Sequence, residues 1–551
     1  MPPSLDELID EKHPVRTVAQ VIDQLDIDAL MKKFKGGGAS SYHPRMLLKI
    51  LVYAYIGNIY SSRRIEAACK ENIHFMWLAG MGRPDHNTIN RFRSERLRNV
   101  LQEVFAQVVL LLADAGNLSL KEVFTDGTKI EANANRYTFV WGKAIKTSRE
   151  RIKGQLKELW AHAQTVAADE LGDDTPPDFD KIDPVHVKGT IDRINEAIKD
   201  KPVPKEVRAK LNYAKKNWAD KLDRYEAQEQ VLDGRNSYSK TDTDATFMRM
   251  KEDHMGNGQL KPGYNLQVST NNQYIVNYSI HHNPTDTTTL PAHIDGHKGL
   301  YKETPGVVVA DAGYGSEQNY GYLEANGIEA YVKHGYFDRD QKAEAGKGRK
   351  NATADKRPFT PEKLYYDAAR DRYICPMGQP MDKIWEGEQR SDAGHKRIIS
   401  KYRARNCEGC PLRGACHRSK TDRTIEASHE GKRLKQEAVE RLRSEKGVAY
   451  RKKRCWDVEP VFANLKQNKG FRRFMLRGKE KVLIETGLLA LAHNLKKKTA
   501  PKGHFFALWA YQIPQAPTMY FAKLISNYIK YKKGRYRDFT SETASFFLPH
   551  R

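Results

Sequence analysis

The chain has 551 residues, and its 93 Lys and Arg against 69 Asp and Glu give a formal net charge of +24. This length predicts several domains, since a domain holds roughly 150 residues. The positive charge favours a polyanionic partner, because each Lys or Arg near a phosphate releases condensed counterions. No apolar run reaches the roughly 18 residues that span a bilayer. The polar start MPPSLDELIDEKHP also lacks the apolar stretch of a secretory signal, so we expect a cytoplasmic protein without a membrane partner.

Residues 1–118 are predicted to be helical, because apolar residues recur at helical spacing through PRMLLKILVYAYIGNIYSSRRIEAAC. In the string GRPDHNTINRFRSERL that follows, Asp85 or Asn87 can cap a short basic helix. A turn followed by a basic helix is typical of proteins that read the major groove of DNA, although ordinary helical bundles show it too. On the DNA-binding interpretation the contacting residues are Arg83, Asn87, Arg91 and Arg93.

Strand patterns begin at residue 119 and return after residue 236. The first, LKEVFTDGTKI, alternates apolar and polar residues and leads into Asp126 and a glycine. The string GYNLQVSTNNQYIVNYSIHHNP gives two alternating runs around Asn271-Asn272, which predicts a hairpin. An apolar, β-branched run then ends at Asp311 in PGVVVADAGYGS.

Two long segments interrupt these strands. Residues 144–235 are highly charged and favour helices, and Pro202 and Pro204 split them into two helices that we expect to pair as an antiparallel hairpin. Residues 338–445 are polar and rich in glycine, contain four of the six cysteines, and close with a charged helix. Residues 501–551 form an aromatic and basic tail to which the sequence assigns no role.

The two strand-end aspartates are candidate metal ligands. Phosphodiester cleavage and transfer use a pair of divalent ions roughly 3.5–4 Å apart, and magnesium or manganese prefers clustered carboxylate oxygens. Such sites form at the carboxyl ends of central strands, where Asp126 and Asp311 are predicted to lie. The alternative is that each aspartate caps the next element, which is a common role for this residue.

Glu459 is the third candidate carboxylate. In VEPVFANLK it stands beside an apolar stripe with the helical spacing i, i+3, i+4, i+7, and Lys466 lies seven residues further on. Pro460 is disfavoured inside a helix, so either a helix begins here with Asp457 as its cap or a longer helix is kinked. The stripe consists of Val458, Val461, Phe462 and Leu465.

Many blocks of the sequence, in order, resemble bacterial insertion-sequence transposases. YHPRMLLKILVYAYIGNIYSSRRIEAAC and PDHNTINRFR resemble their InsH-type N-terminal domain. FTDGTKIEANANRY, TDTDATFM, PGYNLQVST, ADAGYGS and VEPVFANLKQNKGFRRFMLRG resemble blocks of their ribonuclease H-like catalytic domain. The resemblance implies a DDE triad of Asp126, Asp311 and Glu459 that holds two magnesium (or manganese) ions, with cleavage at transposon ends and strand transfer into target DNA.

This resemblance implies an α/β multidomain fold. A helical N-terminal DNA-binding domain (1–118) would precede a ribonuclease H-like mixed-sheet core, which a helical insertion and a cysteine-rich, zinc-binding insertion interrupt. The partners it implies are the terminal inverted repeats of a transposon and target DNA, and the expected assembly is a homodimer, since two ends are joined in one event. The core would comprise residues 119–143, 236–337 and 446–500.

The sequence departs from its relatives at one signature. Many of them carry Tyr seven and Arg four residues before the Glu, where this chain has Lys452 and Cys455, although Lys466 fits the Lys that follows. Arg451 and Arg454 are adjacent substitutes. This difference leaves open how the DNA strands are handled, including any hairpin intermediate. Glu485, in the apolar helix VLIETGLLALAHNL, is the rival for the third carboxylate.

The clustered cysteines predict a structural zinc site. Four thiolates from two turns can close a tetrahedral zinc site, and a metal would stabilise a segment with few apolar residues. His417 is an alternative ligand, and idle reduced cysteines are the competing interpretation. The predicted ligands are Cys375, Cys407, Cys410 and Cys416.

A basic run follows Glu459 in KQNKGFRRFMLRGKEK. Beside a metal site these side chains are expected to bind the DNA backbone, because guanidinium groups match phosphate oxygens; a solvated helix end is the alternative. Two other functions compete with transposition: a nuclease with the same core that cuts without joining, and an inactive zinc-containing DNA-binding regulator. The predicted contacts are Lys466, Lys469, Arg472, Arg473 and Arg477.

Overall fold

The computed structural model describes residues 3–34, 42–171, 177–180, 182–250, 258–344, 359–391 and 394–499. The chain divides into two units, Met1–Asn494 and Leu495–Arg551, and the predicted tail 501–551 lies outside the described residues. Within the described ranges, no helix combines the length and apolarity that crossing a membrane requires.

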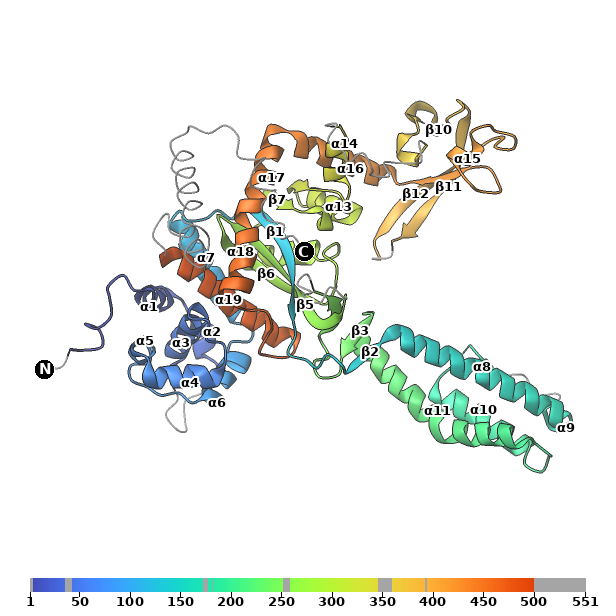
Figure 1. Ribbon diagram of the computed structural model, residues 1–551, viewed down its shortest axis with the longest axis horizontal. Helices are drawn as coiled ribbons and strands as arrows, with labels where there is room; N and C mark the ends of the chain where they lie inside the picture. Colours follow the sequence, from blue (N-terminus) through green and yellow to red (C-terminus); the bar gives the residue numbers. More distant parts are fainter. Residues whose placement is uncertain are drawn as a thin grey trace, which may run out of the picture. The chain divides into compact units, whose positions relative to one another are not determined.

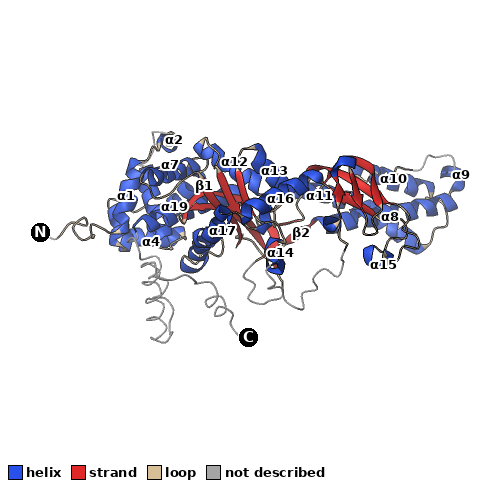
Figure 2. Cartoon of the chain, turned by 90° about the horizontal axis from the view of Figure 1, so that it is seen from above, coloured by secondary structure: helices blue, strands red, loops and turns tan. Residues whose placement is uncertain are grey.

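The described residues that precede the first strand are helical (Figure 2). Helix α3 carries a nearly continuous apolar face, and its buried side chains include Leu48, Leu51 and Tyr55. The elements are α1 (Pro14–Gln24), α2 (Asp28–Met31), α3 (Pro44–Ile56), α4 (Ser62–Glu71), α5 (Ile73–Leu78), α6 (His86–Arg91), the π-helical turn η1 (Phe92–Arg96) and α7 (Leu101–Asp114).

A mixed sheet forms the centre of the first unit (Figure 1). Its strands run in the order β4-β5-β1-β7-β8, and β6 also pairs with β5. Strand β5 is antiparallel to β1 and β6, whereas β7 is parallel to β1 and β8. This mixed α/β arrangement is consistent with the predicted ribonuclease H-like core. The bounds are β1 (Glu122–Glu131), β4 (Thr246–Arg249), β5 (Leu260–Asn271), β6 (Tyr274–His281), β7 (Val307–Ala310) and β8 (Glu329–Val332).

The hairpin between β5 and β6 turns one residue later than predicted. The turn residues are Asn272 and Gln273, whose φ angles are 50° and 63°. Two successive residues with positive φ match the twist of the flanking strands, which is why such turns join antiparallel strands. Asn271 is instead the last residue of β5 and pairs with Tyr274.

Different helices cover the two faces of this sheet. Phe124 and Val309 point to one face, where they share a core with Tyr450 of α17 (Glu445–Asp457). On the other face His293 of α12 (Leu290–Tyr301) lies 2.8 Å from the Ser269 hydroxyl of β5. Other elements around the sheet are η2 (Ala312–Tyr314), α13 (Glu317–Ala325), α14 (Phe337–Glu344), α16 (His429–Arg443), α18 (Glu459–Ala463), the π-helical turn η5 (Asn464–Asn468) and α19 (Lys479–Thr499).

The helical insertion is a small bundle rather than the predicted hairpin. Pro202 and Pro204 do separate two helices, α10 and α11, but α8 also packs on them around Leu156, Ile191 and Trp218. The sequence did not distinguish α8 from the helix that follows it, because the whole segment favours helix. The bounds are α8 (Gly142–Val166), α9 (Ala168–Leu171), α10 (Pro184–Ala197) and α11 (Lys205–Leu232), with β2 (Phe139–Trp141) and β3 (Ser237–Ser239) paired at its base.

The cysteine-rich segment contains its own antiparallel sheet, in the order β13-β12-β11-β10-β9. Its small core includes Tyr373, Met381 and Tyr402. The charged helix predicted to close the segment is α16. The bounds are η3 (Pro361–Lys363), β9 (Tyr366–Asp367), η4 (Ala368–Arg370), β10 (Arg372–Ile374), β11 (Pro380–Arg390), β12 (Lys396–Ala404), α15 (Arg413–Cys416) and β13 (Thr424–Ala427).

Candidate active site

Asp126 and Asp311 lie side by side on two neighbouring parallel strands. Thr125 of β1 is in register with Ala310 of β7, and an aspartate follows each of these residues. Asp311 lies at the end of β7 as predicted, whereas Asp126 lies inside β1, because the antiparallel pairing with β5 continues past Gly127. Side chains alternate between faces along a strand. Asp126 therefore points to the same face as Phe124, which α17 covers, and its carboxylate Oδ1 accepts a hydrogen bond from the Gly127 amide at 2.7 Å. Two carboxylates separated by 185 positions in the sequence are thus neighbours.

Asp311 also caps a short helix, the alternative that the sequence left open. Its carboxylate accepts a hydrogen bond from the Gly313 amide at 2.9 Å, at the start of η2. This bond fixes the side chain at the strand end. The structural and the functional interpretations of Asp311 are therefore compatible, because a carboxylate that accepts one hydrogen bond retains other lone pairs.

Glu459 is the first residue of α18, immediately after α17. Val458 stands at the N-cap without a capping side chain, and Pro460 occupies the first turn. Asp457 does not cap this helix; its carboxylate accepts hydrogen bonds from the Thr270 hydroxyl and the Gln273 amide at 2.7 and 3.0 Å. Proline thus starts a new helix in a chain that hardly changes direction, since Val458 keeps helical backbone angles.

Arg454 of α17 connects the three carboxylates. Its guanidinium lies 3.1 Å from Asp126 Oδ2 and 3.7 Å from Glu459 Oε1. Burial works against the charge of Arg454, but Asp126 and Asp311 outweigh it, and the pKa of the guanidinium is raised. The half-buried Arg454 therefore contacts Asp126 and Glu459 and lies near enough to Asp311 for its charge to act.

Only one of the two predicted arginine substitutes reaches this centre. Arg451 stacks on Phe337, 5.2 Å from the ring centroid, and donates a hydrogen bond to Gln341 at 3.2 Å. Cys455 is exposed and lies near Glu459; partial desolvation of the thiol, and then the charge of Glu459, raise the pKa of this group. Of the two arginines, Arg454 is the one that contacts the carboxylates.

Glu485, the rival carboxylate, lies elsewhere. Its side chain is fully buried in α19 and accepts hydrogen bonds from the Met475 and Leu476 amides at 2.9 Å and from the Tyr55 hydroxyl at 3.2 Å. Burial raises the pKa of this carboxyl group. The contacts of Glu485 give it a structural role and leave Glu459 as the carboxylate near Asp126.

Two family models match parts of the chain. Residues 374–499 match a family described as the transposase DDE domain, and residues 3–95 match one described as a transposase domain (DUF772). These two matches support an insertion-sequence DDE transposase. Glu459 lies inside the first match, whereas Asp126 and Asp311 precede it. No curated protein and no solved structure matches the chain.

Transposases act on transposon ends and on target DNA, and a DDE domain implies a divalent metal ion. Among the described residues, no three His, Cys, Asp or Glu side chains are grouped tightly enough to hold one. The donor chemistry nevertheless fits magnesium or manganese, because the strand ends supply hard carboxylate oxygens. The positive charge of Arg454 lies between Asp126 and Glu459, where these carboxylates would also attract a metal.

The structure identifies a further acidic residue that the sequence did not reveal. Asp286, in the loop between β6 and α12, accepts hydrogen bonds from the Asn265 and Gln267 side chains, both at 2.8 Å. Both amides belong to β5, next to β1. The only sequence signal is an acidic residue in the threonine-rich run NPTDTTTLP, which by itself indicates a loop.

The predicted DNA-reading residues of the N-terminal part separate into two groups. Asp85, rather than Asn87, caps α6 by accepting a hydrogen bond from the Thr88 amide at 2.8 Å. Arg83, Asn87 and Arg91 are exposed. Arg93 is only 3% exposed and donates to the Tyr60 carbonyl, so it is not available at the surface of the transposase.

The basic run after Glu459 divides in the same way. Lys469 is buried, and its ammonium donates to the Tyr55 carbonyl at 3.0 Å, which corrects its predicted place at the DNA surface. Lys466 is half-buried. Arg472, Arg473 and Arg477 are exposed, and each also donates to a neighbouring carbonyl or amide oxygen of the chain.

The structure gives no support to the predicted zinc site. Cys375 and Cys407 pack against the same small core, but within the described residues the four cysteines and His417 form no metal-binding group. The Arg423 guanidinium instead donates to Cys416 Sγ at 2.8 Å. Zinc therefore stays a prediction from the spacing of the cysteines.

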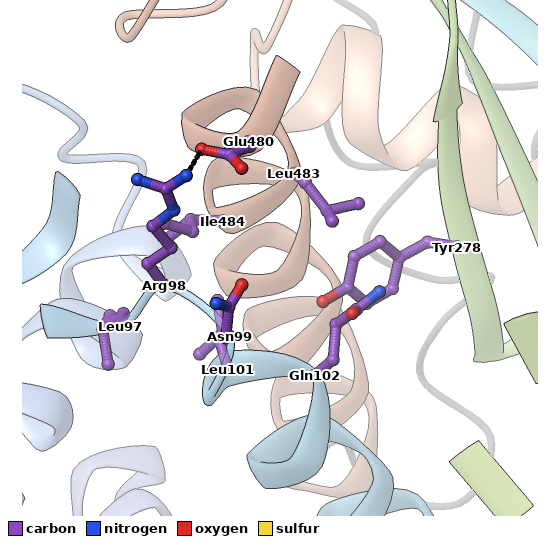
Figure 3. A pocket seen from close by; sticks show the side chains of 9 residues that line it. All are labelled: Leu97, Arg98, Asn99, Leu101, Gln102, Tyr278, Glu480, Leu483 and Ile484. Atoms are coloured by element: carbon purple, nitrogen blue, oxygen red, sulfur yellow. Dashed lines mark ion pairs between the residues drawn. The ribbon is translucent and has the colours of Figure 1, made fainter. Parts of the chain in front are cut away.

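A cavity of about 50 Å³ lies between the start of α7 and α19, away from the acidic centre (Figure 3). The exposed ion pair of Arg98 and Glu480 stands beside it. The Tyr278 hydroxyl faces this side and is buried. None of the three candidate catalytic carboxylates lines this cavity, whose lining is Leu97, Arg98, Asn99, Leu101, Gln102, Tyr278, Glu480, Leu483 and Ile484.

Proposed function

We propose that this transposase cleaves DNA at transposon ends in a metal-dependent reaction and joins the freed ends to target DNA. The observation that carries the proposal is the placement of Asp126 and Asp311 on adjacent parallel strands, with Arg454 between Asp126 and Glu459. We infer that these three acidic groups, from distant parts of the sequence, provide the carboxylates that phosphodiester chemistry needs.

The residues proposed to hold two magnesium ions are Asp126, Asp311 and Glu459. The bound metal would activate the attacking oxygen and stabilise the leaving oxygen. Arg454 offsets part of the negative charge of the carboxylates before DNA binds, and its fork of donors suits a phosphate group when DNA approaches. The hydrogen bond that the Gly313 amide donates to Asp311 would hold one carboxylate in place.

The proposed reaction has a hydrolysis step and a transesterification step. In cleavage, the oxygen of water bonds to the phosphorus at the transposon end and its proton passes to solvent. The bond from that phosphorus to the 3′-oxygen breaks, and the 3′-oxygen takes up a proton from solvent to become a 3′-hydroxyl, leaving a 5′-phosphate. In joining, this hydroxyl oxygen attacks a target phosphate, loses its proton to solvent and displaces the 3′-oxygen of the target strand, which takes up a proton. The oxidation state of phosphorus does not change in either step, so no oxidant or reductant is needed.

The proposed DNA contacts follow from charge and exposure. A net charge of +24 favours a polyanion. Arg83, Asn87 and Arg91 at α6 are proposed to bind the terminal inverted repeats, and Arg472, Arg473 and Arg477 to bind the backbone near the metal. We retain Lys466 in this second group and omit the buried Arg93 and Lys469. A homodimer is proposed because two ends are joined in one event.

The test combines binding, cleavage and joining. Genomic DNA that flanks the coding sequence on each side serves as the end substrate, and a supercoiled plasmid serves as the target. We expect Asp311→Asn to abolish cleavage while end binding persists, and Asp295→Asn, on the exposed side of α12, to behave as the parent chain. Unchanged cleavage by Asp311→Asn would remove this residue from the mechanism.

Two other outcomes would replace the proposed function. Pre-cut ends bypass the first step, so they isolate joining. Cleavage without any joined product would reduce the protein to a nuclease with the same core. Sequence-specific binding with neither cleavage nor joining by the parent chain would indicate a DNA-binding regulator.

A further inference from the structure

Asp286 reaches the acidic centre from the side of the sheet opposite Asp126. It lies in the loop that links β6 to α12, and its Oδ1 atom accepts both amide hydrogen bonds, from Asn265 and from Gln267. Within the described part of the chain, its Oδ2 atom has no hydrogen-bond partner. The loop therefore presents a carboxylate that is held at one oxygen and open at the other.

Two glycines create the space that Asp286 occupies. A Cβ atom on Gly127 would stand 2.5 Å from Asp286 Oδ1 and 2.5 Å from Gln267 Nε2, closer than real Cβ contacts. A Cβ on Gly313 would stand 3.0 Å from Asp311 Oδ1 and 3.6 Å from Asp286 Oδ2. The open oxygen of Asp286 and the carboxylate of Asp311 thus border the same small space.

The loop of Asp286 is tied to the loop of Asp311. The Thr287 hydroxyl donates to the Gly313 carbonyl at 3.1 Å. The Asn319 side-chain amide of α13 donates both to the Thr287 carbonyl and to the Tyr314 carbonyl, at 2.8 and 2.7 Å. The buried Tyr314 hydroxyl donates to Gln267, one of the two amides that hold Asp286. These bonds connect the loop of Asp286 with the loop of Asp311 and with Gln267 of β5.

The charges around Tyr314 show the same proximity. Burial raises the pKa of its hydroxyl well above the ordinary value, and Asp286, Asp126 and Asp311 add to this effect in that order. Arg454 opposes them. Asp286, Asp126 and Asp311 are thus all close enough to act on the same hydroxyl, so a divalent cation would be attracted to their combined charge.

We propose that Asp286 is a fourth acidic residue of the metal centre and acts as a positioning residue. Together with Asn265 and Gln267 it fixes the segments of Gly127 and Gly313, next to Asp126 and Asp311, and its open oxygen adds negative charge beside the metal. The inference rests on the proposed metal-dependent function. It extends the triad, since Asp286 would act through the other two aspartates rather than on DNA.

The test measures Mn²⁺ binding to the full chain without DNA, by isothermal titration calorimetry and by electron paramagnetic resonance. Asp286→Asn keeps an oxygen that accepts the two amide bonds but removes the charge. We expect it to weaken Mn²⁺ binding about 10- to 100-fold, the usual effect of losing a group that supports metal ligands, with an unchanged melting temperature. Asp295→Asn, whose carboxylate contacts Tyr322 instead, should bind Mn²⁺ as the parent chain does.

A second variant separates charge from folding. Asp286→Glu keeps the charge but lengthens the side chain, so it should bind Mn²⁺ more tightly than Asp286→Asn even if both lower the melting temperature. Parent-like Mn²⁺ binding by Asp286→Asn, or no difference between the two variants, would overturn the inference. Mn²⁺ binding by Asp311→Asn is measured in parallel. If Asp311→Asn also binds Mn²⁺ as the parent does, the proposed metal centre itself is refuted. If Mn²⁺ binding is weakened in Asp311→Asn but not in Asp286→Asn, only the role of Asp286 is refuted.

Discussion

Replacing Glu485 tests whether the buried charges between the N-terminal helices and α19 hold the first unit together. Glu485 is fully buried and accepts hydrogen bonds from the Tyr55 hydroxyl and from the Met475 and Leu476 amides. The Arg93 guanidinium donates to the same Tyr55 hydroxyl at 3.3 Å. Glu485→Ala leaves the Tyr55 hydroxyl and the Met475 and Leu476 amides without this acceptor.

The magnitude follows from the number of donors. Each buried donor left without a partner costs about 1–3 kcal/mol, and breaking a buried charge arrangement on one side costs about 3–5 kcal/mol in total. We therefore expect Glu485→Ala to lower the free energy of unfolding by about 3–5 kcal/mol. Glu485→Gln should cost less, because its one oxygen can still accept from the Met475 and Leu476 amides.

The assay is urea unfolding followed by tryptophan fluorescence, with Glu480→Ala as the matched control. Glu480 lies on the same helix but is 61% exposed in its ion pair with Arg98, and such surface pairs contribute about 0–1 kcal/mol. A loss in Glu485→Ala no larger than that of Glu480→Ala would refute the reasoning.

The pH dependence of Glu485 adds a sign that can be checked. Burial raises the pKa of this carboxyl group above its ordinary 4.5, so the folded chain holds the proton more tightly than the unfolded chain. Between the unfolded and the folded pKa, stability therefore falls as the pH rises. Glu485→Gln should remove this part of the slope, and an unchanged slope would show that the ionised carboxylate is fully compensated by its donors.

Two further predictions concern the strand ends and the N-terminal helices. Gly127→Ala should impair cleavage and Mn²⁺ binding, because its Cβ would stand 2.5 Å from two side chains, whereas Gly306→Ala meets a carbonyl oxygen at 3.6 Å and should behave as the parent chain; equal activity would contradict the crowding at Gly127. Hydrogen bonds from Lys70 and then His86 hold the pKa of Glu66 at about 2, below its ordinary 4.5. The stability that Glu66 provides is present above about pH 4.5 and is lost as the pH falls towards 2. The urea midpoint of Glu66→Gln should therefore change less between these two pH values than the midpoint of the parent chain. Equal changes in both proteins would exclude the effect.

The two aspartates were predictable because their signal is local. An apolar run that leads into an aspartate can be found within a dozen residues, and both Asp126 and Asp311 were identified in this way. The strand ends at Asp311 as predicted, but β1 continues past Asp126. The parallel register that places them side by side is a tertiary property. The sequence supported it through the resemblance to transposases, and the paired strands β1 and β7 supply the geometry.

Asp286 was not predictable for the converse reason. Its neighbours Asn265 and Gln267 lie on β5, and their meaning depends on the antiparallel register that sets Gln267 opposite Gly127. A glycine after an aspartate indicates a turn in sequence. In the fold, Gly127 lies inside β1 and leaves room for a side chain from another loop.

The basic residues show why composition predicts a partner better than it predicts contacts. Arg91 and Arg93 are two positions apart and look equivalent in the sequence, yet Arg91 is exposed at the end of α6 while Arg93 is buried against Tyr55 and Tyr60. The difference arises because Glu485, almost four hundred residues later, places an acidic group beside Tyr55. A buried cation needs such a partner, so the burial of Arg93 depends on where α19 packs and not on the residues next to Arg93 in the sequence. The net charge therefore argues for DNA as the partner, but only exposure decides which arginines can meet it.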